Sequence, residues 1–217
     1  MIRVLLADDE ALVRAGVRAI LTSDREIEVV AEVATGGEAV ELARAHRPDV
    51  AVLDIRMPGL DGLSAARDIR TATPDTAVAM LTTFGDDAFV ARALDVGATG
   101  FMLKASDPRE LIAGVRAVSN GGAYLSPSVA IRVLAELKRG DLGRGALARA
   151  RIERLTSRER DVLAMVGTGL SNGQIAGRLF VVEGTVKTHV SAIFDKLGVQ
   201  NRVQAAIVAY EADLVDL

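Results

Sequence analysis

Five polar residues in the first half of the chain stand where short apolar runs end, and their types could support phosphoryl chemistry. In chain order they are Asp8, Asp9, Asp54, Thr82 and Lys104. Carboxylates held close together repel one another, so one takes up a proton unless a cation intervenes. A hard cation with oxygen ligands meets this need, and Mg²⁺ fits it best. With Mg²⁺ bound, one carboxylate can attack a phosphoryl group, while a lysine and a hydroxyl stabilise the phosphoryl oxygens.

Each of these residues also has an ordinary structural explanation. An acidic pair after a strand often caps the next helix, so Asp9 could serve as a cap. Lys104 could be a solvated surface lysine. Neither explanation accounts for the placement of all five at the carboxyl ends of strands. The chain has no GxxxxGK[ST] loop, so ATP is not the obvious phosphoryl donor.

The elements that would position these residues alternate along the chain. Apolar runs predict strands at 2–7, 29–33, 50–53, 77–82 and 99–103. Helical periodicity predicts helices at 10–22, 36–46, 60–72, 86–97 and 107–119. Five such units indicate an α/β fold, a five-stranded parallel sheet with helices on both faces. In the flavodoxin-like order 2-1-3-4-5, the first and third strands flank the crevice in which ligands bind.

The motifs "LLADDE", "VLDIRMPGLDG", "MLTTF" and "GFMLKAS" resemble the receiver domain of bacterial two-component response regulators. The resemblance covers residues 1–119 with every signature in order. It implies that a sensor histidine kinase phosphorylates Asp54. It also implies a Mg²⁺ site formed by Asp8, Asp9, Asp54 and the backbone carbonyl of Arg56.

The same resemblance assigns the remaining pocket residues. Thr82 and Lys104 match the residues that engage the phosphoryl group, and Thr82 also acts as a switch residue with Phe101. Phe101 lies three residues before the lysine and lacks the hydroxyl of the tyrosine common in this family. Any switch in this chain therefore cannot require that hydroxyl.

Residues 120–151 read as a linker that contains a short helix. Asn120-Gly121-Gly122 breaks the chain, and Ser126-Pro127 starts a helix that we expect to end near Lys138. Residues 139–151, rich in Gly, Arg and Ala, indicate a flexible linker, although their arginines could instead contact DNA.

Residues 152–217 contain closely spaced helix-start signals and predict a small all-α domain. Thr156 and Ser171 each open a capping box, and Gly184 leads into a third helix that ends near Leu197. Asn201 can cap a fourth helix. A tight turn between the second and third helices suits a helix-turn-helix, although periodicity alone permits an ordinary helical bundle.

The stretch "LTSRERDVLAMVGTGLSNGQIAGRLFVVEGTVKTHVSAIFDKLGVQNR" closely resembles the LuxR-type DNA-binding domain. The whole chain is thereby similar to NarL/FixJ-type transcriptional regulators. The resemblance implies contacts to double-stranded promoter DNA from Thr185, Lys187, Thr188 and Ser191. It implies a dimer face formed by Val203, Ala206, Ile207 and Tyr210. Val182 departs from the pattern, since relatives commonly have serine there to cap the recognition helix.

Composition and charge indicate two modules with different tasks and, by default, a cytoplasmic protein. Residues 1–119 hold 13 Lys/Arg and 19 Asp/Glu, a net charge of −6, whereas residues 151–217 hold eight of each. The chain has no cysteine, and no apolar run approaches the roughly 18 residues of a membrane span. An early acidic run, reached by position 8, argues against a signal peptide.

We therefore expect a phosphorylation-dependent transcription regulator, a homodimer when phosphorylated, rather than an enzyme. A phosphatase using an aspartyl phosphate is disfavoured, because Arg56 stands two residues after Asp54, where such an enzyme would carry an acid. The alternative is a DNA-binding protein whose receiver is idle and whose binding is independent of phosphorylation.

Overall fold

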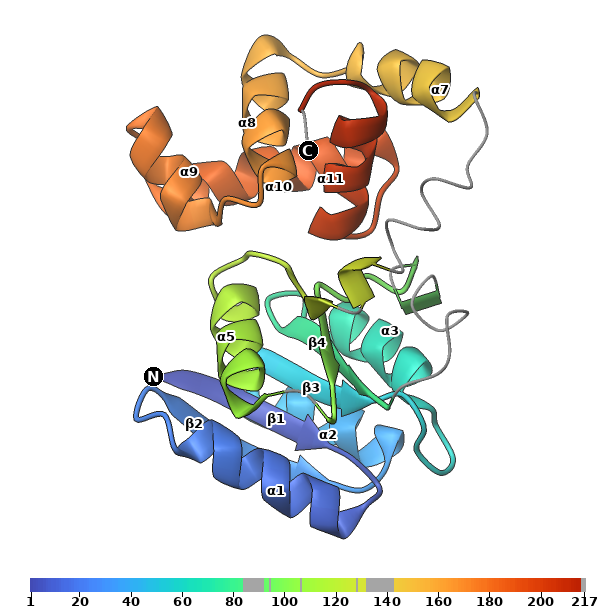
Figure 1. The fold of residues 1–217 in the computed structure, drawn as a ribbon, viewed down its shortest axis with the longest axis vertical. Coiled ribbons are helices and arrows are strands. Elements are labelled where there is room, and N and C mark those ends of the chain that lie inside the picture. Colours follow the sequence, from blue (N-terminus) through green and yellow to red (C-terminus); the bar gives the residue numbers. More distant parts are fainter. Residues whose placement is uncertain (84–91, 94, 106, 128, 132–142, 216–217) are drawn as a thin grey trace. The chain divides into compact units, whose positions relative to one another are not determined.

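A computed structural model describes residues 1–83, 92–93, 95–105, 107–127, 129–131 and 143–215 (Figure 1). The chain forms two compact units: Met1–Ser119 with Tyr124–Val133, and Asn120–Ala123 with Leu134–Leu217. Among the described residues, no helix combines the length and apolar character that a membrane crossing requires.

The first unit is built on a parallel sheet with the strand order β2-β1-β3-β4-β5-β6. Its strands are β1 (Ile2–Ala7), β2 (Ile27–Val33), β3 (Val50–Asp54), β4 (Ala77–Thr82), β5 (Gly100–Leu103) and β6 (Tyr124–Leu125). The predicted α/β class and the order of the first five strands are confirmed. β6 was not predicted: it pairs Tyr124 with Gly100 and Leu125 with Phe101, and so extends the sheet beyond β5.

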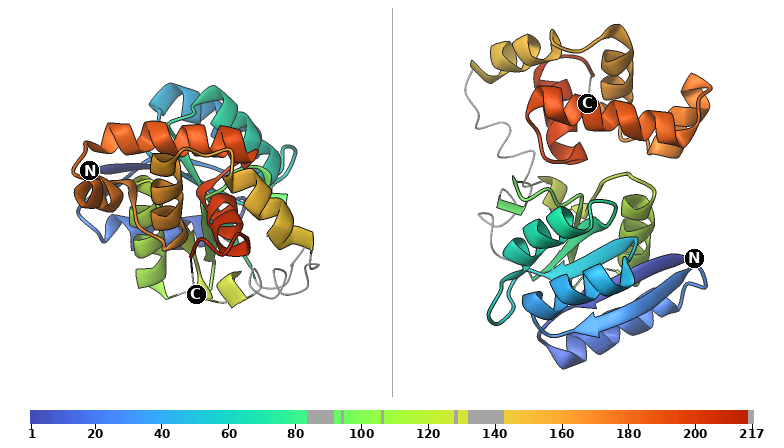
Figure 2. Two further views of the ribbon diagram at one scale, coloured as in Figure 1. Left: turned by 90° about the horizontal axis from the view of Figure 1, so that it is seen from above. Right: turned by 180° about the vertical axis from the view of Figure 1, so that it is seen from behind.

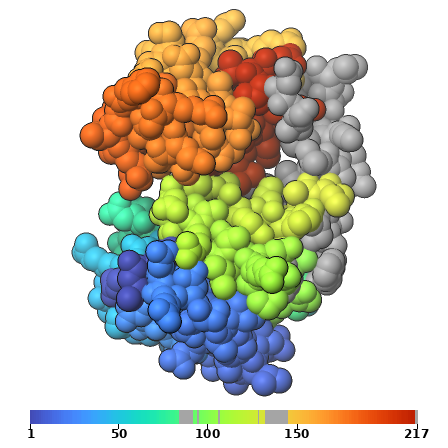
Figure 3. All heavy atoms as spheres, turned by 60° about the vertical axis from the view of Figure 1, so that its left-hand side comes forward, coloured from blue at the N-terminus to red at the C-terminus, as the bar shows by residue number. Residues whose placement is uncertain are grey.

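Helices cover both faces of this sheet. α1 (Ala11–Thr22) and α5 (Pro108–Ser119) pack against one face, where they lie side by side (Figure 3). α2 (Gly36–His46) and α3 (Gly62–Ala72) cover the other face, as the view from behind shows (Figure 2). β3 is buried along its whole length because it is central and covered on both faces, which explains its continuous apolar run.

Two predicted helices fall largely outside the described residues. In the predicted helix 86–97, residues 92, 93 and 95 are helical, and most of the rest lie outside the described residues. In the short helix predicted from Ser126 to Lys138, residues 127 and 129–131 are helical, and residues 128 and 132–138 are outside the described part.

The second unit consists of helices around its own apolar core. They are α7 (Gly143–Ile152), α8 (Ser157–Gly167), α9 (Asn172–Leu179), α10 (Glu183–Leu197) and α11 (Arg202–Glu211). The prediction of a flexible linker is wrong for residues 143–151, which belong to α7. Ala148 is buried in the same core as α8 and α11, so tertiary packing supports this helix despite its glycines.

The predicted helix starts of the second unit are confirmed. Thr156 and Ser171 each accept a hydrogen bond from the third residue of the helix that follows, and both capping boxes are complete. Asn201 caps α11 through a 2.8 Å hydrogen bond from the Gln204 amide. α10 ends at Leu197, and the next residue, Gly198, has a positive φ of 65° that suits glycine.

An ion pair joins the start of α8 to the end of α10. Both carboxylate oxygens of Glu159 lie 2.7 Å from Lys196 Nζ, and one of them also accepts the Thr156 amide at 2.8 Å. These hydrogen bonds, from Lys196 first and then from Thr156, lower the pKa of Glu159. The Glu159 side chain is 8% exposed, so water screens this pair less than an exposed one.

We predict that Glu159→Gln lowers the stability of the second unit by about 1–2 kcal/mol at pH 7. Because the folded-state pKa is depressed, this stabilisation is present above the unfolded pKa and is lost as pH falls through the folded value. Hydrogen exchange of α8 and α10 amides, measured on the full chain from pH 7 to pH 4, checks both statements.

The matched control is Glu183→Gln, which disrupts an exposed pair with Lys187 at 3.6 Å. It should change protection by no more than about 0.5 kcal/mol. Equal protection of α8 in wild type and Glu159→Gln at pH 7 would contradict the prediction.

Candidate functional site: an acidic pocket and a helix-turn-helix

The parallel register brings polar residues from four strand ends to one edge of the first unit's sheet. Ala7 of β1 pairs with Leu53 of β3, Asp54 with Leu81 of β4, and Thr82 of β4 with Leu103 of β5. Asp54 is the last residue of β3, while Asp8 and Lys104 directly follow β1 and β5. All three therefore lie at the same level of the sheet. Sequence reasoning placed these residues on this edge, and the structure brings three of them into direct contact.

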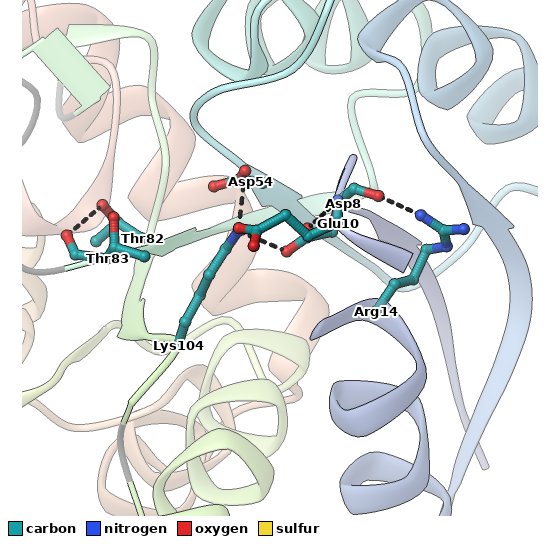
Figure 4. A network of polar contacts seen from close by, with 7 residues as sticks. All are labelled: Asp8, Glu10, Arg14, Asp54, Thr82, Thr83 and Lys104. Atoms are coloured by element: carbon teal, nitrogen blue, oxygen red, sulfur yellow. Dashed lines mark hydrogen bonds and ion pairs between the residues drawn. The ribbon is translucent and has the colours of Figure 1, made fainter. Parts of the chain in front are cut away.

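Lys104 lies at the centre of a cluster with Asp8, Glu10 and Asp54, which we call the acidic pocket (Figure 4). Its Nζ lies 2.9 Å from Asp8 Oδ2, 3.1 Å from Asp54 Oδ2 and 3.1 Å from Glu10 Oε1. The side chains of Lys104, Asp8 and Asp54 are 8%, 0% and 7% exposed, whereas that of Glu10 is 58% exposed. One ammonium group therefore forms ion pairs with two buried carboxylates and one exposed carboxylate.

Burial and ion pairing act in opposite directions on the pKa values of this pocket. Burial raises the pKa of Asp54, and the hydrogen bond from Lys104 only partly offsets it. For Lys104, burial alone would lower the pKa, but hydrogen bonds to Asp8, Asp54 and Glu10 together raise it. Lys104 therefore stays charged at neutral pH. Additional positive charge nearby would favour the ionised form of Asp54.

Asp8, Asp9 and Glu10 place one carboxylate oxygen each within 4.8 Å of one another, a spacing that suits a metal ion. Asp8 Oδ2 is buried and, among the described residues, has no well-aligned hydrogen bond besides its ion pair with Lys104. A buried carboxylate oxygen with spare lone pairs is what a hard divalent cation prefers. These donors therefore fit such a cation.

The loop after Asp54 is held tightly against the end of β3. Gly62 donates its amide to the Ile55 carbonyl at 3.0 Å, and a Cβ on Gly62 would come within 1.9 Å of the Asp54 carbonyl oxygen. Asp61 caps α3 by accepting the Ser64 amide at 2.7 Å. Only glycine at position 62 permits this approach, and the approach fixes the backbone that carries Asp54. The assignment of the Arg56 carbonyl as a metal ligand stays a prediction.

The two residues predicted to form a switch lie apart from the ion pairs. The Thr82 hydroxyl donates to the Thr83 carbonyl at 3.0 Å and is not part of the network around Lys104 (Figure 4). Phe101 is 1% exposed within β5, between Met80 of β4 and Leu125 of β6. Their switch role stays a prediction.

Glu10 and Arg14 contribute to this pocket and were missed by sequence reasoning. Glu10 is the residue preceding α1, so the cap position belongs to it and not to Asp9. Arg14 donates to the Asp8 carbonyl at 2.5 Å and thereby anchors the loop that follows β1. The signal for Glu10 was its place next to two acidic residues, but adjacency alone does not reveal which way a side chain points.

In the second unit, α10 has one buried face and one exposed face. Val186, Val190, Ile193 and Leu197 are buried in the core. Of the predicted DNA contacts, Lys187, Thr188 and Ser191 are exposed and Thr185 is half-buried. The Thr188 hydroxyl donates to the Gly184 carbonyl at 3.1 Å, so only its methyl and lone pairs are directed elsewhere.

α11 is apolar on two opposite sides. Ala205, Val208, Ala209 and the following Ala212 contribute to the core. The predicted dimer residues lie on the other side of the helix: Val203 is buried, Ala206 and Ile207 are half-buried, and Tyr210 is 39% exposed. The dimer role of these residues stays a prediction.

Comparison with known proteins identifies the family. The model described as the response regulator receiver domain matches residues 4–116, and the model described as bacterial regulatory proteins, luxR family, matches residues 153–209. The chain belongs to the response regulators and combines a receiver domain with a LuxR-type DNA-binding domain. This confirms the resemblance seen in the sequence.

The individual relatives span nearly the whole chain. The transcriptional regulatory protein LnrK of Bacillus subtilis (strain 168) is 40% identical over 213 residues, which cover 95% of this chain and 96% of LnrK. LiaR from the same organism is 39% identical over 216 residues and covers all of both chains. The crystal structure of the response regulator ChrA, at 37% identity, covers 99% of this chain and 98% of ChrA with a TM-score of 0.55.

The start of α10 lacks the side-chain cap that α8, α9 and α11 have. Val182 occupies the cap position with extended backbone angles (φ −80°, ψ 151°), and valine has no acceptor for the first amides.

We predict that Val182→Ser stabilises the DNA-binding domain by about 1 kcal/mol. Val182 is 72% exposed, so little apolar burial is lost.

Thermal unfolding of the full chain, combined with hydrogen exchange of the first turn of α10, checks this prediction. Val182→Ala is the control, because it shortens the side chain without adding an acceptor. If serine and alanine gave the same stability, the missing cap would have no energetic consequence.

Proposed function

We propose that a sensor histidine kinase phosphorylates Asp54 and that this modification controls binding of the protein, as a homodimer, to double-stranded promoter DNA. The observation that carries the proposal is the contact of buried Asp54 with Lys104 beside the acidic cluster. An Asp54 oxygen attacks phosphorus, an oxygen–phosphorus bond forms, and the bond from phosphorus to the donor's leaving group breaks.

Each pocket residue has a role in this transfer. Lys104 donates hydrogen bonds to phosphoryl oxygens, and the Thr82 hydroxyl turns from Thr83 toward the same group. Asp8, Asp9, Asp54 and the Arg56 carbonyl would hold Mg²⁺. When bound, Mg²⁺ offsets the negative charge that gathers on the transferred phosphoryl group. Phe101 follows the movement of Thr82 as the second switch residue.

We predict that acetyl phosphate with Mg²⁺ labels wild type and not Asp54→Asn, because asparagine provides no nucleophilic carboxylate. A chelator should abolish the labelling, because the clustered carboxylates then repel the incoming anion. Phosphate-affinity gel electrophoresis and mass spectrometry measure the label. Equal labelling of Asp54→Asn would show that another residue accepts the phosphoryl group.

On the DNA side, the exposed face of α10 is the surface that we assign to the major groove, where the first residues of a recognition helix reach base edges. Lys187 lies in the first half of α10 and its side chain is 65% exposed. Lysine can donate to guanine O6 and N7, and Thr188 presents a methyl group that suits a thymine methyl.

We predict that Lys187→Ala weakens specific binding by about 1–3 kcal/mol and relaxes base preference at one position. Binding to operator and scrambled DNA at two salt concentrations measures this effect. Arg67→Ala, which removes one exposed positive charge from the receiver, is the charge-matched control. It should change neither the specific affinity nor the base preference. If Lys187→Ala weakened both DNAs equally, Lys187 would contact phosphate and bases would be read elsewhere.

Dimerisation supplies the affinity that one domain lacks. Residues 151–217 carry no net charge, so a single copy gains little from phosphate contacts. Two copies on adjacent half-sites bind with a higher effective concentration. The apolar side of α11 that includes Tyr210 is the face that we assign to the dimer.

We predict that phosphorylation raises operator affinity by about 5–150-fold and shifts the mass toward a dimer. Operator titration and light scattering of both forms of the full chain measure the two changes. Equal affinity and equal mass in both forms would support the alternative, a DNA-binding protein with an idle receiver.

A further inference from the structure

Glu10 occupies a helix cap position without acting as a cap. It precedes α1, and among the described residues its side chain makes no hydrogen bond to the first amides of that helix. Serine, threonine, aspartate and asparagine are the residues that cap well at this position. The Glu10 carboxylate instead lies 3.1 Å from Lys104 Nζ (Figure 4).

Lys104 contacts three carboxylates of two kinds, and the contact with Glu10 is a hydrogen bond of 3.1 Å. A lysine ammonium has three N–H donors, and Lys104 faces Asp8, Asp54 and Glu10. Asp8 and Asp54 are buried, and the proposed function engages both of them in cation binding or phosphoryl transfer. Glu10 is exposed and lies near Asp8 and Asp9, but it is not among the proposed Mg²⁺ ligands, Asp8, Asp9, Asp54 and the Arg56 carbonyl, so it can stay on Lys104.

We infer that Glu10 is a positioning residue that holds the Lys104 ammonium in the pocket while phosphoryl transfer to Asp54 takes place. When an Asp54 oxygen bonds to phosphorus and the donor's leaving group departs with its electron pair, Lys104 turns one N–H toward a phosphoryl oxygen. Asp8 would hold the cation. Glu10 keeps its own N–H from Lys104 throughout, so the ammonium stays directed at the pocket.

This inference rests on Asp54 as the phosphoacceptor, and it differs from a general electrostatic role for Glu10. As one more negative charge, Glu10 would attract the cation and repel the phosphodonor whether or not Lys104 were present. As a positioning residue, it acts only through Lys104. A double-mutant cycle separates the two, because residues that act through one contact are not additive.

The first experiment measures the rate of labelling by acetyl phosphate with saturating Mg²⁺ in the full chain. Glu10→Ala should lower the rate about threefold when Lys104 is present, and by a smaller factor or not at all in Lys104→Ala. Glu41→Gln, which removes an exposed negative charge from α2, is the matched control and should label at the wild-type rate. An unchanged rate in Glu10→Ala, or the same loss with and without Lys104, would overturn the inference.

The second experiment does not depend on phosphorylation. Hydrogen exchange of the Lys104 ammonium, followed by ¹⁵N NMR of Nζ and assigned by its loss in Lys104→Ala, reports how firmly the group is held. Glu10→Gln should accelerate this exchange about threefold or more in protein without divalent cations, whereas Glu41→Gln should not. Equal exchange in Glu10→Gln and wild type would also overturn the inference, even if Lys104→Ala labelled too slowly for the first experiment.

The two proposals fail in different ways. If Asp54→Asn were labelled as well as wild type, the proposed function would be wrong. If labelling required Asp54 but the Glu10 variants matched wild type in rate and in Lys104 exchange, only the role of Glu10 would be wrong.

Discussion

The ammonium group of Lys104 contacts the two buried carboxylates, Asp8 and Asp54, at the edge of the receiver sheet. Burial raises the pKa of Asp54, and the hydrogen bond from Lys104 partly offsets this effect and so favours the charged carboxylate. The contact is possible because the parallel register places the ends of β1, β3 and β5 at one level. The sheet is therefore the support for an electrostatic arrangement, and the tight turn at Gly62 fixes the central carboxylate within it.

The DNA-binding domain uses a partly similar contact for a different purpose. Glu159 and Lys196 join two helices that are distant in sequence, and Glu159 also completes a capping box. This pair fixes the end of α10 against the start of α8, while the apolar face of α10 fills the core. The exposed face of α10 can then vary without loss of the fold. Rigid support beneath an exposed reading surface is the feature common to both domains.

The sequence was most informative where one physical rule dominates. Continuous apolar runs predicted the central strands, because both faces of the sheet are covered, and cap residues located the starts of α8, α9 and α11. The contact of Glu10 was not predicted because it involves a lysine 94 residues away in the sequence. α7 was not predicted because Gly143 and Gly145 disfavour a helix, and the packing of Ala148 and Ile152 against the core outweighs that preference.

Strand β6 was not predicted for a different reason: it has only two residues, and it follows the Asn-Gly-Gly sequence that predicts an interruption of regular structure. Its hydrogen bonds are nevertheless specific, since the Tyr124 amide donates to the Thr99 carbonyl at 3.0 Å and the Ser126 amide to the Phe101 carbonyl at 2.9 Å. A receiver expressed alone and cut at residue 119 would lose this strand and leave the β5 edge open. Open edges pair with other chains. Self-association of such a fragment would be a consequence of the truncation. A fragment that extends through Ser126 would keep β6 paired with β5.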